Sequence, residues 1–313
     1  MKLILKLIKI IIFLMIVAII WGRFIEPNKL VVTHKDLVLP NWSHRLDNLK
    51  VVAISDMHIG TPTINEEKLV EIVQLANAQK PDLIFLLGDM DALAIKASKI
   101  NTNKISRILS GFHSKYGVVA VMGNHDYDTN IIRTIIKNAH IPLLENESLV
   151  LKSKGLNIVG VEDFWMGHPD YRKATRYIKK SRPTILLSHN PDYFPLVPKS
   201  VSLTLSGHTH GGHINLPYLG GLFIISDYGQ RFMKGHIAEN GKQLFVSSGI
   251  GGVPVRIGNP PEIVVLTLHS DDNGHHLIVN TPQNKGVDYS YVPMLLKIRH
   301  NDTLRQFVRK YIK

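Results

Sequence analysis

The segment Ser206–Gly212 carries two histidines, His208 and His210, on a turn flanked by glycines. Histidine is the commonest metal-binding side chain in proteins. Side chains two residues apart on an extended segment point to the same side, so both imidazoles are expected to face one site. Two neighbouring histidines are also typical of an ordinary solvated turn, so the rest of the chain must decide between these readings.

Polar residues of the same kind follow four other apolar runs that are rich in Val and Ile. In a sheet with parallel strands, ligands bind at the carboxyl ends of the strands. These residues are therefore expected to converge at one rim, and five such strand ends favour a shared metal site over five coincidences. Asp56 and His58 follow Lys50–Ser55, Asp89 follows Asp82–Leu87, Asn124 and His125 follow Gly117–Met122, His189 follows Thr184–Ser188, and the His208–His210 turn follows Val201–Leu205.

The candidate ligands are two carboxylates, one amide and four imidazoles, which are too many for one tetrahedral ion with an open position. Shared between two divalent ions, they leave room for water. Nitrogen and oxygen ligands without sulfur suit Mn²⁺, Fe or Zn²⁺. Two such ions, two carboxylates and one hydroxide leave a net charge of about +1, which attracts a phosphate ester. The candidates are Asp56, His58, Asp89, Asn124, His189, His208 and His210, whereas Asp91, Asp126 and Asp192 are expected to cap turns or to support ligands.

The order Asp-x-His, Gly-Asp, Gly-Asn-His-Asp, a later His and Gly-His-x-His, over about residues 48–270, resembles the calcineurin-like metallophosphoesterase superfamily. Residues 188–192, the Gly-His-Thr-His-Gly-Gly turn and residues 248–256 resemble its membrane-associated YkuE/YaeI-like branch. That branch usually has Gln after the paired glycines, where this chain has His213.

The resemblance implies a role for each candidate. One metal would be held by Asp56, His58 and His210, the other by Asn124, His189 and His208, with Asp89 bridging the two. His125 would not be a ligand; it would protonate the leaving oxygen or stabilise the pentavalent phosphorus. The implied activity is hydrolysis of a phosphate ester, in particular a phosphodiester, by a hydroxide that bridges two metal ions.

The pattern of elements predicts an α/β fold. Helical patterns occupy Asn65–Gln79, Ser98–His113, Ile131–Ala139 and Arg172–Lys180, and mostly strands follow Leu222. An α/β half followed by a β half suggests two packed sheets with helices outside, and the resemblance implies the same four-layer α/β/β/α sandwich. Further strands are expected at Leu30–Leu39, Ser148–Lys152, Asn157–Val161, Leu244–Ser248, Glu262–Leu268 and His276–Val279.

The N-terminal segment predicts a transmembrane helix. Leu3–Trp21 is interrupted only by Lys6 and Lys9 and as a helix would span about 29 Å, close to a bilayer core. The alternative, a cleaved signal peptide, fits less well because a cut after Gly22 would place Ile20 where a small residue is needed. Basic residues at the start place the N-terminus in the cytosol and the body on the outer side.

The charge distribution and the composition of the chain exclude or disfavour several other classes of protein function. The net charge of +12 is concentrated at the ends: residues 1–23 carry +4 and residues 297–313 carry +5. This distribution fits a membrane surface and disfavours a nucleic acid partner. With no cysteine, disulfides and thiolate chemistry are excluded. The apolar stripe of residues 301–313 predicts a terminal helix that packs on the body or lies on an anionic membrane.

We therefore expect four regions: an anchor (1–23), a linker with an edge strand (24–48), a metallophosphoesterase domain (49–282) and a basic tail with an amphipathic helix (283–313). The expected partners are a phosphate ester, in one version lipid-linked, and the membrane. Two alternatives are a metal-free binding scaffold, which should have lost ligands, and a nuclease, which would need a basic groove. Tyr228, Arg231 and Arg256 are candidates to line the pocket, although Arg256 is equally expected as a surface ion-pair partner.

Overall fold

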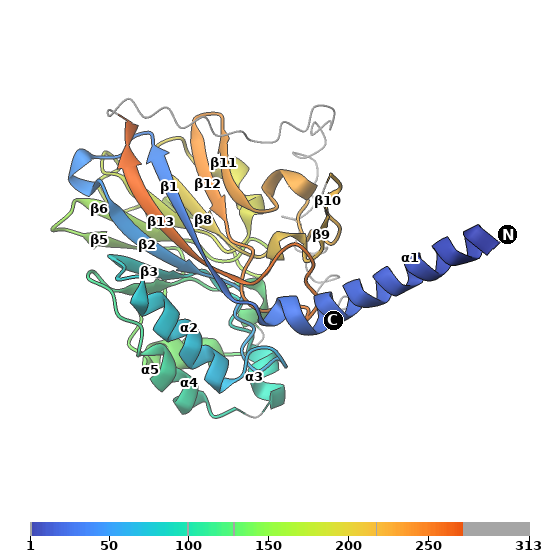
Figure 1. Cartoon of the computed structure of the whole chain (residues 1–313). Helices are drawn as coiled ribbons and strands as arrows, with labels where there is room; N and C mark the ends of the chain where they lie inside the picture. Colours follow the sequence, from blue (N-terminus) through green and yellow to red (C-terminus); the bar gives the residue numbers. More distant parts are fainter. Residues whose placement is uncertain (1, 99, 128, 217, 272–313) are drawn as a thin grey trace, which may run out of the picture.

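The computed structural model describes residues 2–98, 100–127, 129–216 and 218–271 (Figure 1). Within them, two sheets pack face to face with helices on the outside. This confirms the predicted α/β sandwich. The strand expected at His276–Val279 and the helix expected at residues 301–313 lie outside the described residues.

The first sheet has the strand order β1-β13-β2-β3-β4. Strands β2, β3 and β4 are parallel, whereas β13 runs antiparallel to β2 and parallel to the edge strand β1. The parallel trio therefore brings three strand ends to one rim. The bounds are β1 Val31–Leu39, β2 Leu49–Ile54, β3 Leu83–Leu86, β4 Val118–Ala120 and β13 Glu262–Ser270.

The second sheet has the order β11-β12-β8-β7-β6-β5. Its four central strands are parallel, and an antiparallel strand closes each edge. A separate two-stranded hairpin, β9–β10, follows β8. The bounds are β5 Glu147–Leu151, β6 Leu156–Gly160, β7 Thr184–Leu187, β8 Leu203–Ser206, β9 Asn215–Leu216, β10 Gly220–Gly221, β11 Gly235–Glu239 and β12 Lys242–Val246.

Three apolar layers hold these elements together. Alternate residues of the first sheet, such as Val52 and Ile84, face the helices, whereas Val51 and Phe85 face the second sheet. The outer face of the second sheet is covered by a third cluster that includes Phe194. The central strands β3 and β7 are fully buried and largely apolar, as is usual for parallel sheets covered on both sides, whereas the edge strands β1 and β11 are partly exposed.

The helices differ in extent from the sequence prediction. The helix expected over Ser98–His113 is the shorter helix α4, which starts at Thr102 because the Asn101 side chain caps it by accepting from the Asn103 N–H at 2.9 Å. Helix α3, which ends at Ser98, was not predicted. The helix expected over Arg172–Lys180 is a single turn, α6. The bounds are α2 Glu66–Ala78, α3 Ala92–Ser98, α4 Thr102–Leu109, α5 Ile131–Asn138 and α6 Tyr171–Ala174.

The N-terminal helix α1, Lys2–Ile20, projects away from the body and has no buried residue (Figure 1). With the short helical turns that follow, it forms a 27-residue segment, Lys2–Asn28, with a mean hydropathy of 3.0 in its most apolar window. Its length and composition suffice to cross a membrane. Helix α1 is thus a candidate membrane anchor.

Candidate metal centre

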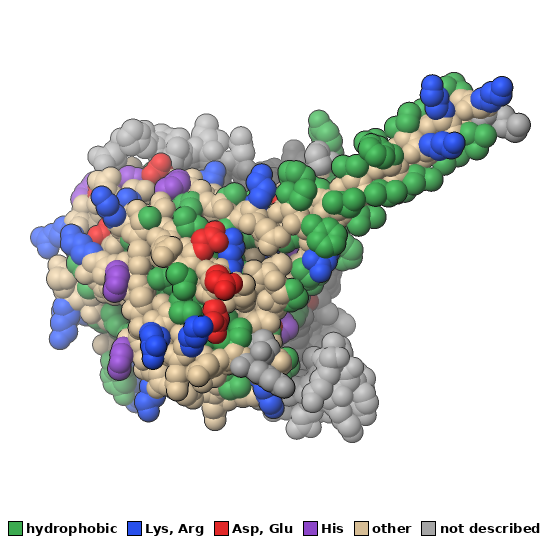
Figure 2. All heavy atoms as spheres, turned by 60° about the horizontal axis from the view of Figure 1, so that its bottom comes forward, with side chains coloured by type: hydrophobic (Ala, Val, Ile, Leu, Met, Phe, Trp, Pro, Cys, Tyr) green, Lys and Arg blue, Asp and Glu red, His purple; other side chains and the backbone are tan. Residues whose placement is uncertain are grey.

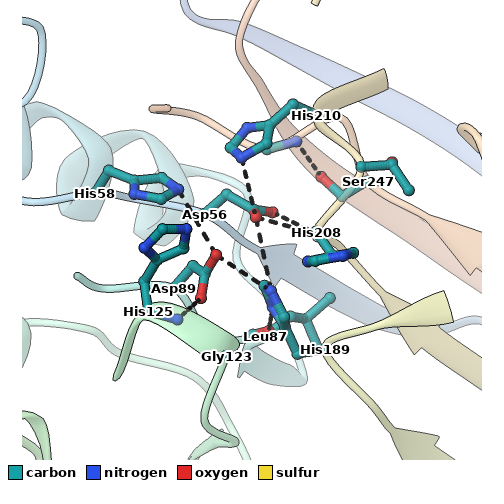
Figure 3. Close-up of polar contacts among 12 residues, drawn as sticks. Asp56, His58, Leu87, Asp89, Gly123, His125, His189, His208, His210 and Ser247 are labelled. Atoms are coloured by element: carbon teal, nitrogen blue, oxygen red, sulfur yellow. Dashed lines mark hydrogen bonds and ion pairs between the residues drawn. The ribbon is translucent and has the colours of Figure 1, made fainter. Parts of the chain in front are cut away.

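Six of the seven predicted ligands come together in two compact groups at the carboxyl ends of the parallel strands (Figure 3). The first group is Asp56, His58 and His210, and the second is Asp89, His189 and His208. Within each group the potential ligand atoms lie within 4.8 Å of one another, and all six side chains are buried. The first group contains the three residues expected to hold one metal, and the second contains His189 and His208 together with Asp89, the expected bridge.

Asp89 lies between the two groups. Its Oδ2 atom is 3.3 Å from His189 Nε2 and 3.8 Å from His58 Nε2, so this oxygen faces one imidazole of each group. Its other oxygen, Oδ1, accepts the His125 backbone N–H at 2.9 Å. One carboxylate therefore connects the two groups and the turn that carries His125.

Asp56 also reaches both groups. Its Oδ1 atom is 3.6 Å from His210 Nε2 and 4.0 Å from His189 Nε2. The backbone N–H of His208 lies 3.1 Å from both of its oxygens. The two buried carboxylates therefore face a common set of imidazoles.

Hydrogen bonds to the Nδ1 atoms orient two of these imidazoles. His189 Nδ1 lies 2.7 Å from the Leu87 carbonyl oxygen, and His58 Nδ1 lies 3.0 Å from Asp91 Oδ2. A ring nitrogen facing a carbonyl oxygen must carry the proton, which leaves Nε2 as the atom with a free lone pair. Metal-ligating histidines are held in this way by acceptors behind them.

Two buried atoms fit the role of metal ligands because the described residues provide them with no hydrogen-bond partner. They are His58 Nε2 and Asn124 Oδ1. Asn124 lies between Gly123 and His125 in a 3₁₀ turn that starts at the end of β4. Buried polar atoms are almost always bonded, so these two need a partner that the described part of the chain does not supply, and a cation meets that need.

The pKa values in this pocket follow from burial and from the crowding of like and unlike groups. Burial raises the pKa of Asp56. Burial acts in the same direction on Asp89, but the neighbouring His189 imidazole outweighs it and holds the pKa of Asp89 well below its usual range. Burial and the nearby His58 hold the pKa of His210 well below the ordinary value. His210 therefore stays neutral, which is the form that binds metal.

Five of the candidate ligands adopt a left-handed backbone conformation that residues other than glycine rarely adopt. Their φ angles lie between +44° and +72°. Such strain costs of the order of 1–3 kcal/mol per residue and persists where the surroundings impose it, often at functional sites. The backbone N–H of Asp56 donates to the Gly88 carbonyl and that of His58 to the Asp89 carbonyl, both at 3.0 Å. The five residues are Asp56, His58, Asp89, His208 and His210.

Glycines let the turns approach the carboxylates. A Cβ at Gly207 would lie 1.8 Å from Ser55 Oγ and 2.4 Å from Asp56 Oδ2. A Cβ at Gly123 would lie 2.2 Å from Asp89 Oδ1. Neither position has space for a side chain, so both glycines are needed for the two ligand groups to meet.

His125 is exposed, unlike the six acidic and imidazole ligands. Its ring packs edge-on against His58, with 5.2 Å between the ring centroids. The following Asp126 fixes the turn by accepting the Gly123 N–H at 2.9 Å. His125 therefore lies on the rim, next to the site and within reach of a bound molecule.

Comparison with known proteins agrees with this geometry. The family model for calcineurin-like phosphoesterase matches residues 49–212, which include all seven predicted ligands and His125. The chain belongs to the calcineurin-like phosphoesterase family. Members of this family hydrolyse phosphate esters, so the chain is a metallophosphoesterase with two groups of residues suited to metal binding.

Three relatives show where this phosphoesterase lies within the family. It is 29% identical over 260 residues to metallophosphoesterase YkuE of Bacillus subtilis, covering 80% of this chain and 89% of the relative. It is 28% identical over 308 residues to UDP-2,3-diacylglucosamine pyrophosphatase LpxG of Chlamydia muridarum, with coverage of 79% and 92%. It is 33% identical over 244 residues to metallophosphoesterase Cj0846 of Campylobacter jejuni, with coverage of 74% and 62%.

Two residues of the phosphoesterase site were missed by the sequence analysis. Trp165 packs edge-on against His208 with 4.4 Å between the ring centroids. It follows β6, whose end carries the carboxylate of Asp163, so the strand-end pattern did contain a signal for it. The Asn259 Nδ2 group donates to the His210 carbonyl at 2.6 Å. Nothing near Asn259 in the sequence indicates this contact.

Three side chains that were candidates to line the pocket have other partners. Arg256 is buried, and its guanidinium donates to the carbonyls of Ser248 and Gly251 at 2.9 and 2.8 Å, so its assignment as a surface ion-pair partner is wrong. Arg231 pairs with Glu239, and Tyr228 packs in the third apolar cluster.

His213, which follows the paired glycines of the turn, stacks on His210. Their ring centroids are 4.7 Å apart and the rings are nearly parallel, at 19°. Burial lowers the pKa of His213 to about 4. A neutral, stacked His213 supports one face of the His210 ring.

Asp91→Asn is expected to weaken metal binding by about 10–100-fold, the usual effect of losing the acceptor behind a ligating histidine. Asn tolerates the Asp91 φ of +72°, and its oxygen can still accept the Ala94 N–H that caps α3. The atom that faces His58 Nδ1 then becomes an amide NH2 group, so the change removes the acceptor behind His58. Titration of the metal-free chain with Mn²⁺ measures the effect. An unchanged affinity would show that the Asp91 charge does not support His58.

Proposed function

We propose that this phosphoesterase hydrolyses phosphodiesters at a centre of two divalent metal ions, at a membrane surface. The observation that carries the proposal is the pair of buried ligand groups with Asp89 between them. Asp56, His58 and His210 would hold one ion, and Asn124, His189 and His208 the other. The donors are all nitrogen and oxygen, which suits Mn²⁺, Fe or Zn²⁺.

When bound, such a pair of ions neutralises phosphate charge and lowers the pKa of water so that hydroxide is available at neutral pH. The chain supplies the remaining functions. Asp91 and the Leu87 carbonyl fix the His58 and His189 rings before substrate arrives. Trp165 and His213 cover the His208 and His210 rings, which limits the access of bulk water.

We propose that His125 acts on the leaving group. Its backbone is held by Asp89 and its ring is exposed on the rim. A protonated imidazole there would give its proton to the departing oxygen, or a neutral N–H would donate to a phosphate oxygen in the transition state. Both roles require contact with substrate but no contact with a metal.

A lipid-linked phosphate ester is the substrate class that we propose. The relative LpxG is named as a pyrophosphatase of UDP-2,3-diacylglucosamine, a nucleotide joined to an acylated sugar. In this chain, the apolar helix α1 would keep the domain at a bilayer that contains such molecules. We further propose that the N-terminus lies in the cytosol and the domain on the outer side, because Lys2, Lys6 and Lys9 precede the most apolar stretch.

The function is tested with the full chain in lipid nanodiscs, stripped of metal and reloaded separately with Mn²⁺, Zn²⁺ or Fe²⁺. A phosphomonoester, a soluble phosphodiester and a lipid-linked diphosphate are compared as substrates. We expect no turnover without metal, turnover of the diester above the monoester, and the highest kcat/KM with the lipid-linked substrate. Metal should also raise the unfolding temperature, because a ligand that binds only the folded state stabilises it.

Two outcomes would contradict parts of this proposal. A chain that binds two ions but hydrolyses none of the three substrates would be a binding scaffold. A chain that prefers the monoester would remain a phosphoesterase but not a phosphodiesterase. The variant Asp36→Asn, which changes an exposed carboxylate on β1, serves as the control for handling and should behave like the unmodified chain.

A further inference from the structure

A run of exposed apolar side chains lies beside the metal centre, in residues 218–225, here called the apolar loop. Its exposed members are 40–106% accessible, and the loop includes strand β10. Single exposed apolar residues are common, but a contiguous group marks a surface that contacts another apolar body. The group is Tyr218, Leu219, Leu222, Phe223 and Ile225.

The apolar loop is attached directly to the turn that carries His210. The Phe223 N–H donates to the Gly212 carbonyl at 3.3 Å, and the Leu222 N–H donates to the Ile214 carbonyl at 2.9 Å. Strand β10 also pairs with β9. These bonds hold the loop next to the metal centre, so a molecule that contacts the loop also lies near the centre.

The same region is attached to the base of α1. The Asn215 N–H of β9 donates to the Ile257 carbonyl at 2.8 Å, and the neighbouring Arg256 N–H donates to the Gly22 carbonyl at 2.9 Å. Gly22 is packed so closely that a Cβ would lie 2.6 Å from Ile257 Cγ1. Residues 256–257 therefore connect the end of α1 to the hairpin, and both extend from the same side of the body (Figure 1).

A buried carboxylate strengthens this connection. Glu26 Oε1 accepts the Asn259 N–H at 2.6 Å, and its Oε2 accepts the Trp21 Nε1–H at 2.7 Å. Asn259 in turn bonds to the His210 carbonyl. Hydrogen bonds from Trp21 to Glu26, and through Asn259 to His210, thus fix the direction of α1 relative to the metal centre.

The side chains of α1 and of the residues at its base indicate that the apolar surface in contact with the apolar loop is a lipid bilayer. Hydrophobic side chains cover α1 along its length (Figure 2). At its base, Arg23 lies 5.1 Å from the Phe24 ring and Lys29 lies 5.6 Å from the Trp21 ring. Aromatic rings combined with basic groups are typical of the membrane interface, where the rings lie at headgroup level and the cations meet anionic lipids.

We propose that the apolar loop lies in the interfacial layer of the bilayer that receives α1. The protein then has two membrane attachments, which fix the orientation of the domain and hold the mouth of the metal centre at the level of the lipid headgroups. This inference rests on the proposed role of α1 as a membrane anchor. It adds to that role a second, separate membrane contact in the catalytic domain.

The test uses single cysteines, because the chain has none of its own. A spin label is attached to the full chain in phosphatidylglycerol-containing vesicles at Leu219→Cys or Phe223→Cys. Leu14→Cys within α1 is the control for a lipid position. Tyr177→Cys, which is 87% exposed and precedes β7 at the end of the sheet opposite the site, is the control for a water position. Accessibility to oxygen, which concentrates in lipid, is compared with accessibility to an aqueous nickel chelate.

We expect the ratio of oxygen accessibility to nickel accessibility at positions 219 and 223 to be several-fold higher than the ratio at position 177. It should approach the ratio at position 14. Ratios at 219 and 223 equal to the ratio at 177, with 14 in lipid, would overturn the inference and leave the anchor intact. Spin–spin broadening at 219 and 223 would show that a second copy covers the loop, which also overturns it. A water-like ratio at 14 would refute the anchor and this inference together.

The labelling experiment requires no enzymatic turnover, so its result does not depend on whether the proposed phosphodiester hydrolysis is correct. Unfolding temperatures of the labelled chains show whether each variant has folded. Because the two loop positions are labelled in different chains, loss of one variant leaves the other as a test.

Discussion

Asp89→Asn is expected to reduce bound metal from two ions per chain to fewer than one and to lower kcat/KM by at least about 10²–10³-fold, the size of losing one preorganised electrostatic contact. The Asp89 Oδ2 atom lies 3.3 and 3.8 Å from one imidazole of each ligand group. Removing its charge leaves Asp56 as the single buried carboxylate between the two groups. Two divalent ions would then repel each other with less negative charge between them.

The substitution is chosen so that the fold survives. Asn tolerates the Asp89 φ of +54°, and its amide oxygen can still accept the His125 N–H. Alanine would neither tolerate this φ angle nor accept the His125 N–H, so the effect of backbone strain could not be separated from the effect of losing the ligand. Metal content is measured by elemental analysis after dialysis, with Asp36→Asn as the matched change at an exposed site. A variant that retains two ions would show that Asp89 is not a bridge.

His125→Ala is expected to lower kcat by about 10²–10⁴-fold while both metals stay bound, because proton transfer by one positioned side chain contributes that much. The ring is exposed and contacts His58 edge-on, whereas the backbone N–H that bonds to Asp89 remains in the variant. The ligand groups should therefore keep their arrangement. KM should change much less than kcat, since the interaction is made in the transition state.

The leaving group separates the two roles open to His125. If His125 donates a proton, a substrate with an alcohol leaving group should suffer far more than one that releases p-nitrophenolate, which departs without a proton. If His125 stabilises the phosphate oxygens instead, both substrates should slow equally. His113→Ala, at an exposed histidine before β4 and away from the site, is the matched control. Loss of metal from His125→Ala would contradict its assignment as a residue that does not bind metal.

The chemistry of the site could be predicted from the sequence because it depends on residue types and on their order along the chain. Each apolar strand buried on both faces ends in a polar residue, and parallel strands must bring those ends to one rim. Thus Asp56, Asp89 and His189 were predicted to meet, although the first and the last lie 133 positions apart. The start of α4 was less predictable, because the Asn101 cap places it at Thr102, whereas the helical pattern suggested a start at Ser98.

The support behind the ligands depended on tertiary structure. The bonds from Asn259 to His210 and from Glu26 to Asn259 join residues 49 and 233 positions apart, and no local pattern encodes either contact. The left-handed backbone at Asp56 and Asp89 likewise depends on tertiary packing, because aspartate adopts this conformation only uncommonly.

Arg256 shows the physical reason for this division. The sequence shows that its side chain is cationic, and that alone suggested a surface ion pair. The fold surrounds the guanidinium with the carbonyls of the turn that packs against Asp56 and His210, so it is buried as a structural donor. Residue chemistry and strand order are properties of the chain, whereas the partner of a side chain depends on which distant backbone the packing brings within hydrogen-bond distance.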